Sequence, residues 1–281
     1  MGKTLFISDL DGTLLNSGAK ITPVTASIIN NLLDAGVIIS YATARSYNTA
    51  ARAAGDINFK YPAVHHGGVF IQDPKSGEYF DKCVFAQDKA ARLIRALQDN
   101  RLRPLVYAII GGRERVSYIA GEETAGINFY LESRRNDRRL RPVRHYADFT
   151  GDIYEILFLG NDYDELKQLA CDLNLEPYFA HHIHVDAYEY ADGKNKYWLE
   201  FMRADAQKDT GVCKVRQLVG ADRIVCFGDN INDMPMFGIS DEAYAVANAL
   251  PEAKQAATGV IGSNDQDGVA RWLEQNAHRY I

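Results

Sequence analysis

Residues 4–13 read TLFISDLDGT, and this stretch decides the fold expected for the whole chain. The apolar run Thr4–Ser8 ends in acidic and glycine residues, a pattern that is typical of a buried parallel strand. Thr22-Pro23 then gives an N-cap with proline at the first helical position, followed by an apolar helical face. Val37–Ala42 is a second apolar strand, so the region predicts a strand–helix–strand unit in a parallel sheet covered by helices.

The same pattern returns near the C-terminus. It consists of a helix at Lys208–Leu218, strands at Arg223–Phe227 and Tyr244–Ala247, and a last helix at Asp267–Ala277. Between these parts, strands and helices mix without a parallel-sheet pattern. We therefore predict an α/β fold: a doubly wound, Rossmann-like parallel-sheet core formed by residues 1–83 and 191–281, with an inserted α+β cap domain over residues 84–190.

Composition excludes several classes of protein. The chain has 281 residues and a net charge of −6, which gives no indication of a nucleic-acid partner. The apolar runs Leu105–Ile110 and Tyr244–Leu250 are far shorter than the ~18 residues of a membrane span, so no membrane partner is expected. The four cysteines lack CxxC spacing, and a leader peptide would be removed together with Asp9, so we expect a cytoplasmic protein. The sequence does not predict its oligomeric state.

Asp9 and Asp11 form the first of four polar clusters at strand ends. Residues i and i+2 at the end of a strand point the same way, so both carboxylates can reach one substrate. One carboxylate can attack phosphorus to form an aspartyl phosphate, and the other can act as acid and base. Gly12 allows a sharp turn. Two acids in a loop that lacked the preceding apolar strand and the following Gly12-Thr13 would be expected only to cap the next helix.

Two further clusters are weaker signals when each is taken alone. Thr43 lies just past the second strand and is followed by Ala44 and by Arg45, which begins a helix; a hydroxyl and free amides at a helix N-terminus suit a phosphate oxygen. The alternative is a simple helix cap. Lys208 opens a helix and could neutralise a phosphate, although most lysines are solvated surface residues.

The fourth cluster, GDNIND at residues 228–233, follows an apolar strand and gathers acid and amide side chains in one turn. Such crowding is costly unless a positive charge lies among the acids. Oxygen ligands without His or Cys favour Mg²⁺ over Zn²⁺. The alternative is an ordinary Asn/Asp-rich turn.

Together these residues resemble the haloacid dehalogenase-like hydrolase superfamily. DLDGT at 9–13 is similar to its first motif, ISYATAR at 39–45 to its second, Lys208 to its third, and GDNINDM at 228–234 to its fourth. The insert between the second and third motifs resembles the large α/β cap of the Cof-type subgroup. The closing segment SNDQDGVA at 263–270 is also similar to that subgroup.

The resemblance implies a role for each matching residue. Asp9 would be the nucleophile and Asp11 the general acid and base. Mg²⁺ would be held by Asp9, Asp229 and the carbonyl of Asp11, with Asp233 orienting its water shell. The residues implied in phosphate binding are Thr43 with its neighbour Ala44, Lys208 and Asn232.

We therefore expect a Mg²⁺-dependent phosphatase that hydrolyses a small phosphate monoester, such as a sugar phosphate, through an aspartyl phosphate. A sugar-phosphate mutase would use the same core and return the phosphate to its substrate. A dehalogenase would not need Asp11. A binding protein without activity would be expected to lack one of the main site residues, namely Asp9, Asp11, Lys208 or Asp229.

Four features leave alternatives open. His66 stands where the subgroup usually has Asn, and it either lines the site or packs beside it. Asp209 could pair with Lys208. Ten arginines against five acids between residues 101 and 144 could read a second anionic group, although a solvated surface is the simpler interpretation. His181, His182 and His184 favour a cap strand over a zinc site, because no clear further ligand accompanies them.

Overall fold

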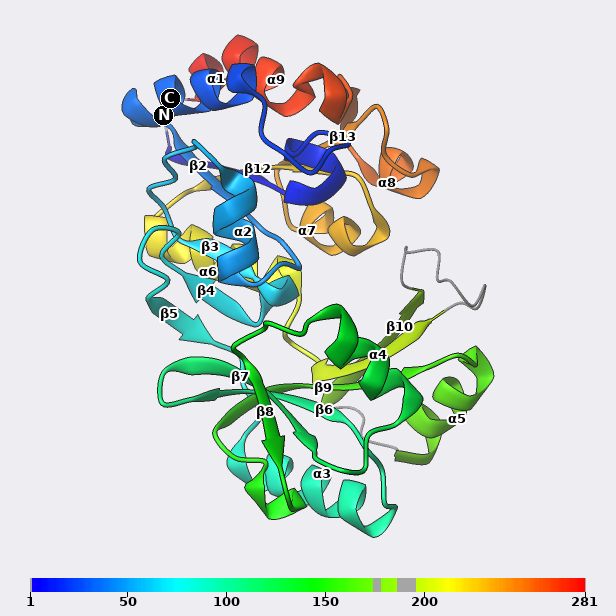
Figure 1. Ribbon diagram of the computed structural model, residues 1–281. Coiled ribbons are helices and arrows are strands. Elements are labelled where there is room, and N and C mark those ends of the chain that lie inside the picture. The colour runs from blue at the N-terminus through cyan, green and yellow to red at the C-terminus, as the bar shows by residue number, and fades with distance from the viewer. Residues whose placement is uncertain (1, 174–177, 186–195, 281) are drawn as a thin grey trace. The chain divides into compact units, whose positions relative to one another are not determined.

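The computed structural model describes residues 2–173, 178–185 and 196–280, and the chain divides into two compact units (Figure 1). The first unit comprises Met1–Lys82 and Asp205–Ile281, and the second comprises Cys83–Ala204. The chain therefore returns to the first unit at Asp205, whereas the sequence prediction placed this return at residue 191.

The first unit is built on a five-stranded parallel sheet in the order β14-β13-β12-β1-β2. The N-terminal strand β1 lies between β2 and β12, so strands from both ends of the sequence meet at the centre of the sheet. This is the parallel α/β core that the sequence predicted. Its strands are β1 (Thr4–Ser8), β2 (Ile38–Tyr41), β12 (Arg223–Gly228), β13 (Glu242–Val246) and β14 (Gly259–Ile261).

Helices cover both faces of this sheet (Figure 1). On one face, the Trp272 ring of α9 contacts Phe6 of β1 and Phe227 of β12 edge-on, with centroids 6.4 and 5.2 Å apart. On the other face, the Cys226 thiol lies 3.6 Å from the Met236 carbonyl oxygen of α7. The helices of this unit are α1 (Pro23–Asp34), α2 (Tyr47–Ala54), α6 (Lys208–Val219), α7 (Met234–Gly238), α8 (Pro251–Ala256) and α9 (Gly268–Asn276).

A small antiparallel sheet follows α2 in the first unit and was not predicted. It consists of β3 (Ala63–His65), β4 (Phe70–Gln72) and β5 (Tyr79–Lys82). A single parallel bridge from Ala42 to Val64 connects it with the residue after β2. The first strand of this sheet therefore passes close to Thr43, whose backbone N–H donates to the Val64 carbonyl at 2.9 Å.

The second unit contains a six-stranded mixed sheet in the order β10-β11-β9-β6-β7-β8. Only the β7/β8 pair is parallel, as expected for an α+β domain. The strands are β6 (Leu105–Ile110), β7 (Arg113–Ile119), β8 (Leu140–Val143), β9 (Asp152–Gly160), β10 (Phe179–Val185) and β11 (Tyr197–Arg203), and the helices are α3 (Gln87–Asp99), α4 (Ala125–Ser133) and α5 (Tyr163–Leu173).

Strand β11 explains where the second unit ends. It pairs antiparallel with both β9 and β10, so residues up to 204 belong to this unit. The apolar segment Trp198–Met202 lies in the part of the sequence predicted as core, residues 191–281, but it belongs to the second unit. His181, His182 and His184, which were predicted to lie on a cap strand, fall within β10.

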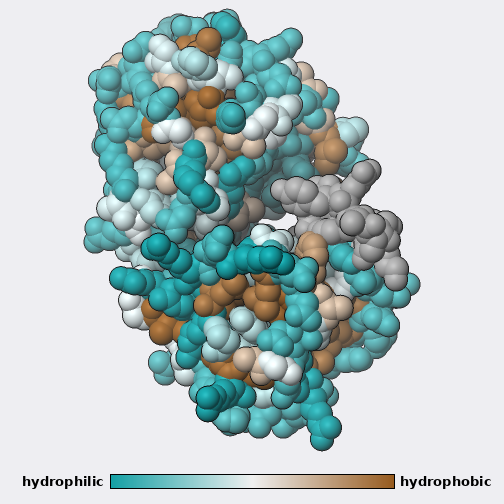
Figure 2. All heavy atoms as spheres, viewed as in Figure 1, coloured by the Kyte–Doolittle hydropathy of each residue, from teal (hydrophilic) through white to brown (hydrophobic). Residues whose placement is uncertain are grey.

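Among residues 2–173, 178–185 and 196–280, none of the helices combines the length and the apolar character that a membrane span requires. The face of the molecule in view in Figure 2 carries mainly hydrophilic residues, with hydrophobic residues in separate patches.

Candidate active site

Asp9 lies at the carboxyl end of β1 and is buried. Its backbone N–H donates to the Phe227 carbonyl at 2.9 Å, which continues the pairing between β1 and β12. The chain then makes a single tight turn over Leu10–Leu14, in which Gly12 has φ = +76°. The turn follows the strand directly, so Asp9 is fixed by the sheet rather than by a loop.

Gly12 is required by the close approach of a second strand end. A Cβ atom added here would lie only 2.9 Å from Cγ of Asp229, closer than real Cβ atoms approach a neighbour. Its backbone conformation also disfavours any residue with a side chain. Asp229 follows β12, so the glycine lets the carboxylates from two neighbouring strands approach each other.

Asp229 and Asp233 are held by the turn that follows β12. Asp233 is fully buried, and one of its oxygens accepts hydrogen bonds from the N–H groups of Asp229 and Asn230 at 2.9 and 3.0 Å. Asp229 accepts a hydrogen bond from the Thr13 hydroxyl at 2.8 Å. Both carboxylates are therefore oriented before any ligand binds.

Lys208, the first residue of α6, is buried between two of these acids. Its Nζ lies 2.6 Å from Oδ1 of Asp9 and 2.6 Å from Oδ1 of Asp233. Asp209, which the sequence suggested as a partner of Lys208, instead accepts a hydrogen bond from the Thr210 N–H at 2.7 Å. Lys208 is therefore directed at the predicted nucleophile.

Burial dominates the electrostatics of the cluster. It raises the pKa of Asp9 to about 7, against the opposing effect of Lys208, and it raises the pKa of Asp229 against the Thr13 hydrogen bond. Burial lowers the pKa of Lys208, but Asp9 and Asp233 outweigh it and raise that pKa above its ordinary value. Three acids face one buried ammonium group, which leaves an excess of negative charge.

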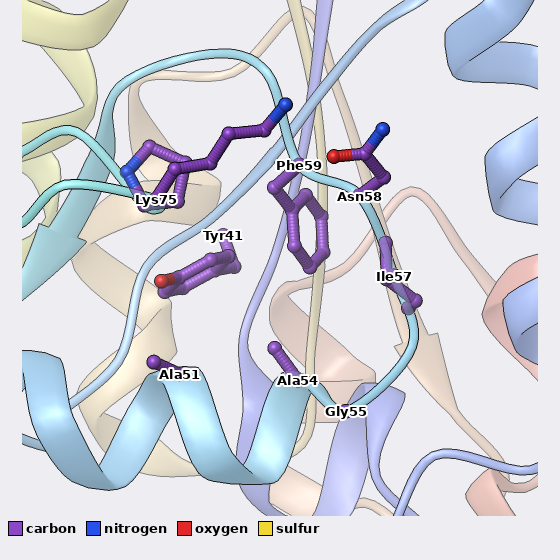
Figure 3. Close-up of a pocket in the computed structure, with 9 residues that line it drawn as sticks. Tyr41, Ala51, Ala54, Gly55, Ile57, Asn58, Phe59 and Lys75 are labelled. Atoms are coloured by element: carbon purple, nitrogen blue, oxygen red, sulfur yellow. The ribbon is translucent and has the colours of Figure 1, made fainter.

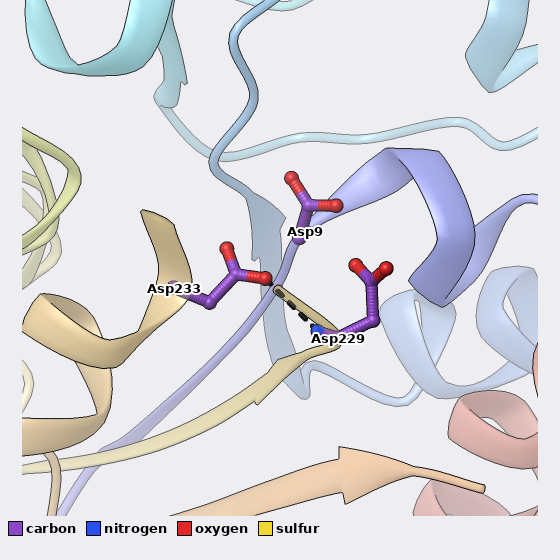
Figure 4. A group of neighbouring side chains, drawn as sticks. All are labelled: Asp9, Asp229 and Asp233. Carbon is purple, nitrogen blue, oxygen red and sulfur yellow. Dashed lines mark hydrogen bonds between the residues drawn. The ribbon is translucent and has the colours of Figure 1, made fainter. Parts of the chain in front are cut away.

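The three carboxylates converge from two strand ends (Figure 4). One oxygen each from Asp9, Asp229 and Asp233 lie within 4.8 Å of one another, and no other such group of three acids, histidines or cysteines occurs among the described residues. A set made only of carboxylate oxygens suits a hard divalent cation. The side chain of Asp11 is not part of this group.

Asp11 instead faces Arg45, from the loop before α2. Arg45 Nε lies 2.7 Å from Asp11 Oδ2, and its Nη2 lies 2.5 Å from Asp11 Oδ1. The ion pair is therefore bidentate. No role for Arg45 was predicted from the sequence.

The predicted phosphate-binding residues differ in burial. Thr43 is buried, and its hydroxyl oxygen accepts a hydrogen bond from the Arg45 N–H at 3.1 Å. Ala44 and Asn232 are exposed. The His66 ring packs edge-on against Phe70 with centroids 5.4 Å apart, which supports the packing interpretation for this histidine.

Asn248 contacts the site, and no role for it was predicted from the sequence. The Asn248 side-chain amide donates to the Gly12 carbonyl at 2.7 Å, and its oxygen accepts from the Asn264 N–H at 2.9 Å. An asparagine just after an apolar strand is a weak signal, because such residues also occur in ordinary turns. Its partner Gly12 could be identified only from the fold.

A cavity of about 120 Å³ lies apart from these residues in the first unit (Figure 3). Tyr41, Phe59, Asn58 and Lys75 contribute to its wall, together with small residues of α2. None of the predicted site residues lines it.

In the second unit, the arginines and histidines noted in the sequence have structural contacts. Arg139 forms ion pairs with Asp137 and Glu114 at 2.7 and 3.2 Å. The Arg134 guanidinium lies over the Tyr130 ring, 4.1 Å from its centroid. The His181 ring lies 5.9 Å from that of Phe201, and burial lowers the pKa of His182.

Comparison with known proteins identifies the family. The model of the haloacid dehalogenase-like hydrolase family matches residues 6–273. The phosphatase YwtE of Bacillus subtilis, which is named for 5-amino-6-(5-phospho-D-ribitylamino)uracil, is 25% identical over 95% of this chain and 96% of its own. The pyridoxal phosphate phosphatase YbhA of Escherichia coli is 22% identical over 94% and 95% of the two chains.

Solved structures share the fold. TM0651 of Thermotoga maritima superposes with a TM-score of 0.77 at 20% identity, covering 98% of this chain and 97% of its own. A haloacid dehalogenase-like hydrolase of Bacteroides thetaiotaomicron gives a TM-score of 0.74 at 21% identity, covering 97% and 99%. The family match spans nearly all of the sequence and includes every predicted site residue, so the chain belongs to the haloacid dehalogenase-like hydrolase family.

Proposed function

We propose that this protein is a Mg²⁺-dependent phosphatase that hydrolyses a small phosphate monoester through an aspartyl phosphate on Asp9. One observation carries the proposal: a buried carboxylate at a strand end is bonded to a buried lysine beside two further buried or half-buried acids. Such an arrangement costs folding free energy, because buried charges are desolvated. A cost of this kind is typical of functional sites.

The residues present fit a magnesium ion. Asp9, Asp229 and Asp233 offer oxygen ligands only, and their excess negative charge over Lys208 calls for a cation. The absence of a side chain at Gly12 keeps the space beside Asp229 open. When bound, the ion would neutralise charge on the phosphoryl group. Asp9 and Asp229 would hold it, with the Asp11 carbonyl, and Asp233 would orient its water shell.

In the first half-reaction, a carboxylate oxygen of Asp9 attacks phosphorus. Oδ1 of Asp9 is bonded to Lys208, and among the described residues Oδ2 accepts no hydrogen bond, which leaves Oδ2 for the attack. The bond between phosphorus and the ester oxygen breaks as the new bond forms. The departing oxygen takes a proton from Asp11, and Asp9 becomes an aspartyl phosphate.

In the second half-reaction, water attacks phosphorus and gives its proton to Asp11. The bond between phosphorus and Asp9 breaks, which releases inorganic phosphate and restores both aspartates. Lys208 and Thr43 would bind the phosphoryl oxygens during both steps, with the backbone amide of Ala44 and the exposed amide of Asn232 at the rim. Thr43 can serve this purpose because its hydroxyl accepts from Arg45 and keeps its own proton for donation.

The names of similar proteins support a small metabolite as substrate. YwtE and YbhA are both named as phosphatases of phosphorylated small molecules. We propose the same substrate class for this chain, namely a sugar phosphate or a similar monoester.

The test is phosphate release from p-nitrophenyl phosphate with and without Mg²⁺. The variant Asp9→Asn should abolish release, because the amide cannot form the acyl phosphate. Asp56→Asn, which changes an exposed aspartate in the same unit, should leave turnover unchanged. Normal turnover by Asp9→Asn would contradict the assigned nucleophile. A panel of sugar phosphates, with and without an activating bisphosphate, would distinguish hydrolysis from a mutase reaction.

A further inference from the structure

The ion pair between Arg45 and Asp11 has a more restricted geometry than an ordinary surface ion pair. Both oxygens of Asp11 accept hydrogen bonds from two different nitrogens of one guanidinium group, at 2.7 and 2.5 Å. This fork geometry fixes the orientation of a carboxylate as well as its position. No other cation pairs with Asp11 among the described residues.

Arg45 is itself held on several sides. Its backbone N–H donates to the Thr43 hydroxyl at 3.1 Å, and its carbonyl accepts from the His66 N–H at 3.0 Å. One guanidinium nitrogen also reaches the Thr49 carbonyl at 3.5 Å. The guanidinium is therefore oriented by the loop that carries Thr43 and by the first turn of α2.

Asp11 needs such a partner because of its neighbours. It follows Asp9 by two residues, and its charge acts on Asp229. Repulsion from these acids favours a position of Asp11 further out in solvent, and its side chain is already 52% exposed. An exposed ion pair contributes little to stability, so stability alone does not account for the fork.

We infer that Arg45 is a positioning residue that holds the carboxylate of Asp11 in place as the base of the second half-reaction. The inference rests on the proposed function. The two hydrogen bonds hold both oxygens of Asp11 in one orientation, and this orientation decides which oxygen can reach the attacking water. Without Arg45, the carboxylate of Asp11 can still accept a proton, but it is no longer held in position.

The substrate 2,4-dinitrophenyl phosphate isolates this step. Its leaving group is a weak base and departs without a proton, so formation of the aspartyl phosphate does not need Asp11. For Arg45→Ala we expect kcat to fall about 10-fold or more while kcat/KM stays within about 3-fold. The slow second step should also produce a burst of one dinitrophenolate per active site.

A double-mutant cycle tests whether Arg45 acts only through Asp11. Asp11→Asn should show the same burst, and adding Arg45→Ala to it should lower kcat no further. If Arg45 contacts the phosphoryl group itself, its loss lowers kcat/KM in both backgrounds and gives no burst. That outcome would overturn the inference, as would an unchanged kcat in Arg45→Ala.

Controls separate folding from positioning. Arg223→Ala removes an arginine of the same unit that pairs with Glu242 at 3.0 Å, and it should leave both rate constants unchanged. Arg45→Lys keeps the positive charge but cannot form the bidentate pair, so it should recover only part of kcat. If Arg45→Ala does not fold, Arg45→Lys is compared with the wild-type protein instead. Full recovery by lysine would contradict the positioning role. Failure of the wild-type protein to release phosphate at all would contradict the proposed function instead.

Discussion

At the scale of single residues, the site depends on an absent side chain. Gly12 combines a left-handed backbone with a position where a Cβ would overlap the Asp229 carboxylate. Gly12→Ala must therefore displace either the turn that follows Asp9 or Asp229 itself. The first shift would move Asp11, the proposed acid and base, and the second would move a proposed ligand of the metal ion, so either would disturb the geometry of the reaction.

For Gly12→Ala we expect about a 10²-fold loss of Mg²⁺-dependent phosphate release, because misplacement of about 1 Å can cost that much. Gly220→Ala is the matched control: Gly220 has φ = +64° and no atom near its added Cβ. It should cost about 1 kcal/mol of stability and leave turnover unchanged. Equal loss of activity in both variants would show that backbone strain alone is responsible.

The sequence predicted the carboxylates of the site better than their partners. Asp9 and Asp229 each follow an apolar strand, and parallel strands end at one edge of the sheet, so their convergence could be expected. The partner of Asp11 could not be predicted, because only the folded positions of β2 and of the loop before α2 bring Arg45 within reach of it. The same holds for Asn248, which contacts the backbone of Gly12 rather than a side chain.

At the scale of elements, α1 and α9 are joined by one acidic side chain. Asp267, at the start of α9, accepts hydrogen bonds from the hydroxyls of Thr22 and Thr25 at the start of α1. The Thr22 hydroxyl oxygen also caps α1 by accepting from the Thr25 N–H at 3.0 Å. One carboxylate thereby fixes the beginnings of two helices from opposite ends of the sequence.

Asp267→Ala should lower the free energy of unfolding by about 2 kcal/mol, since hydrogen bonds to a charged group contribute about 1.5–3 kcal/mol. Asp265→Ala removes an exposed acid that accepts two hydrogen bonds from Ser17, and it should lower the free energy of unfolding by less than Asp267→Ala does. Urea unfolding of both variants makes the comparison. A larger loss for Asp265→Ala would contradict the interpretation.

Elements with a clear apolar pattern were predicted well, and three-residue strands were not. The strand at Thr4–Ser8 has the predicted bounds, and the strand at Arg223–Gly228 and the helix at Lys208–Val219 each extend one residue beyond the prediction. The three-residue strands Ala63–His65 and Phe70–Gln72 lie around a glycine turn and are too short to show a period. Strand β11 has a clear apolar pattern, but only its pairing assigns it to the second unit.

At the scale of the whole molecule, buried acids make stability depend on pH. In the second unit, burial raises the pKa of Glu200 to about 7, and burial together with Glu200 raises the pKa of Glu155 well above its ordinary value. The unfolded chain releases the Glu200 proton near pH 4.5, whereas the folded chain keeps it up to about pH 7. The resulting stabilisation is complete below pH 4.5 and is lost as the pH rises to about 7.

Glu200→Gln stays neutral at every pH, so it should gain stability relative to the wild-type protein by about 1–3 kcal/mol between pH 5 and pH 8. Unfolding of both proteins at the two pH values measures this gain. Glu132→Gln, which changes an exposed glutamate of α4, should show no such gain. A constant difference between Glu200→Gln and wild type would contradict the role of burial.

The order of the strands in the first unit also has a consequence for synthesis on the ribosome. The central strand β1 is among the first parts of the chain to emerge, but its neighbour β12 begins only at Arg223. Until then, one side of β1 has unpaired backbone groups, with Leu5, Phe6 and Ile7 along the strand. The nascent chain therefore carries Asp9, the proposed nucleophile, at the end of an open, apolar strand edge, and most of the protein must be translated before that edge closes.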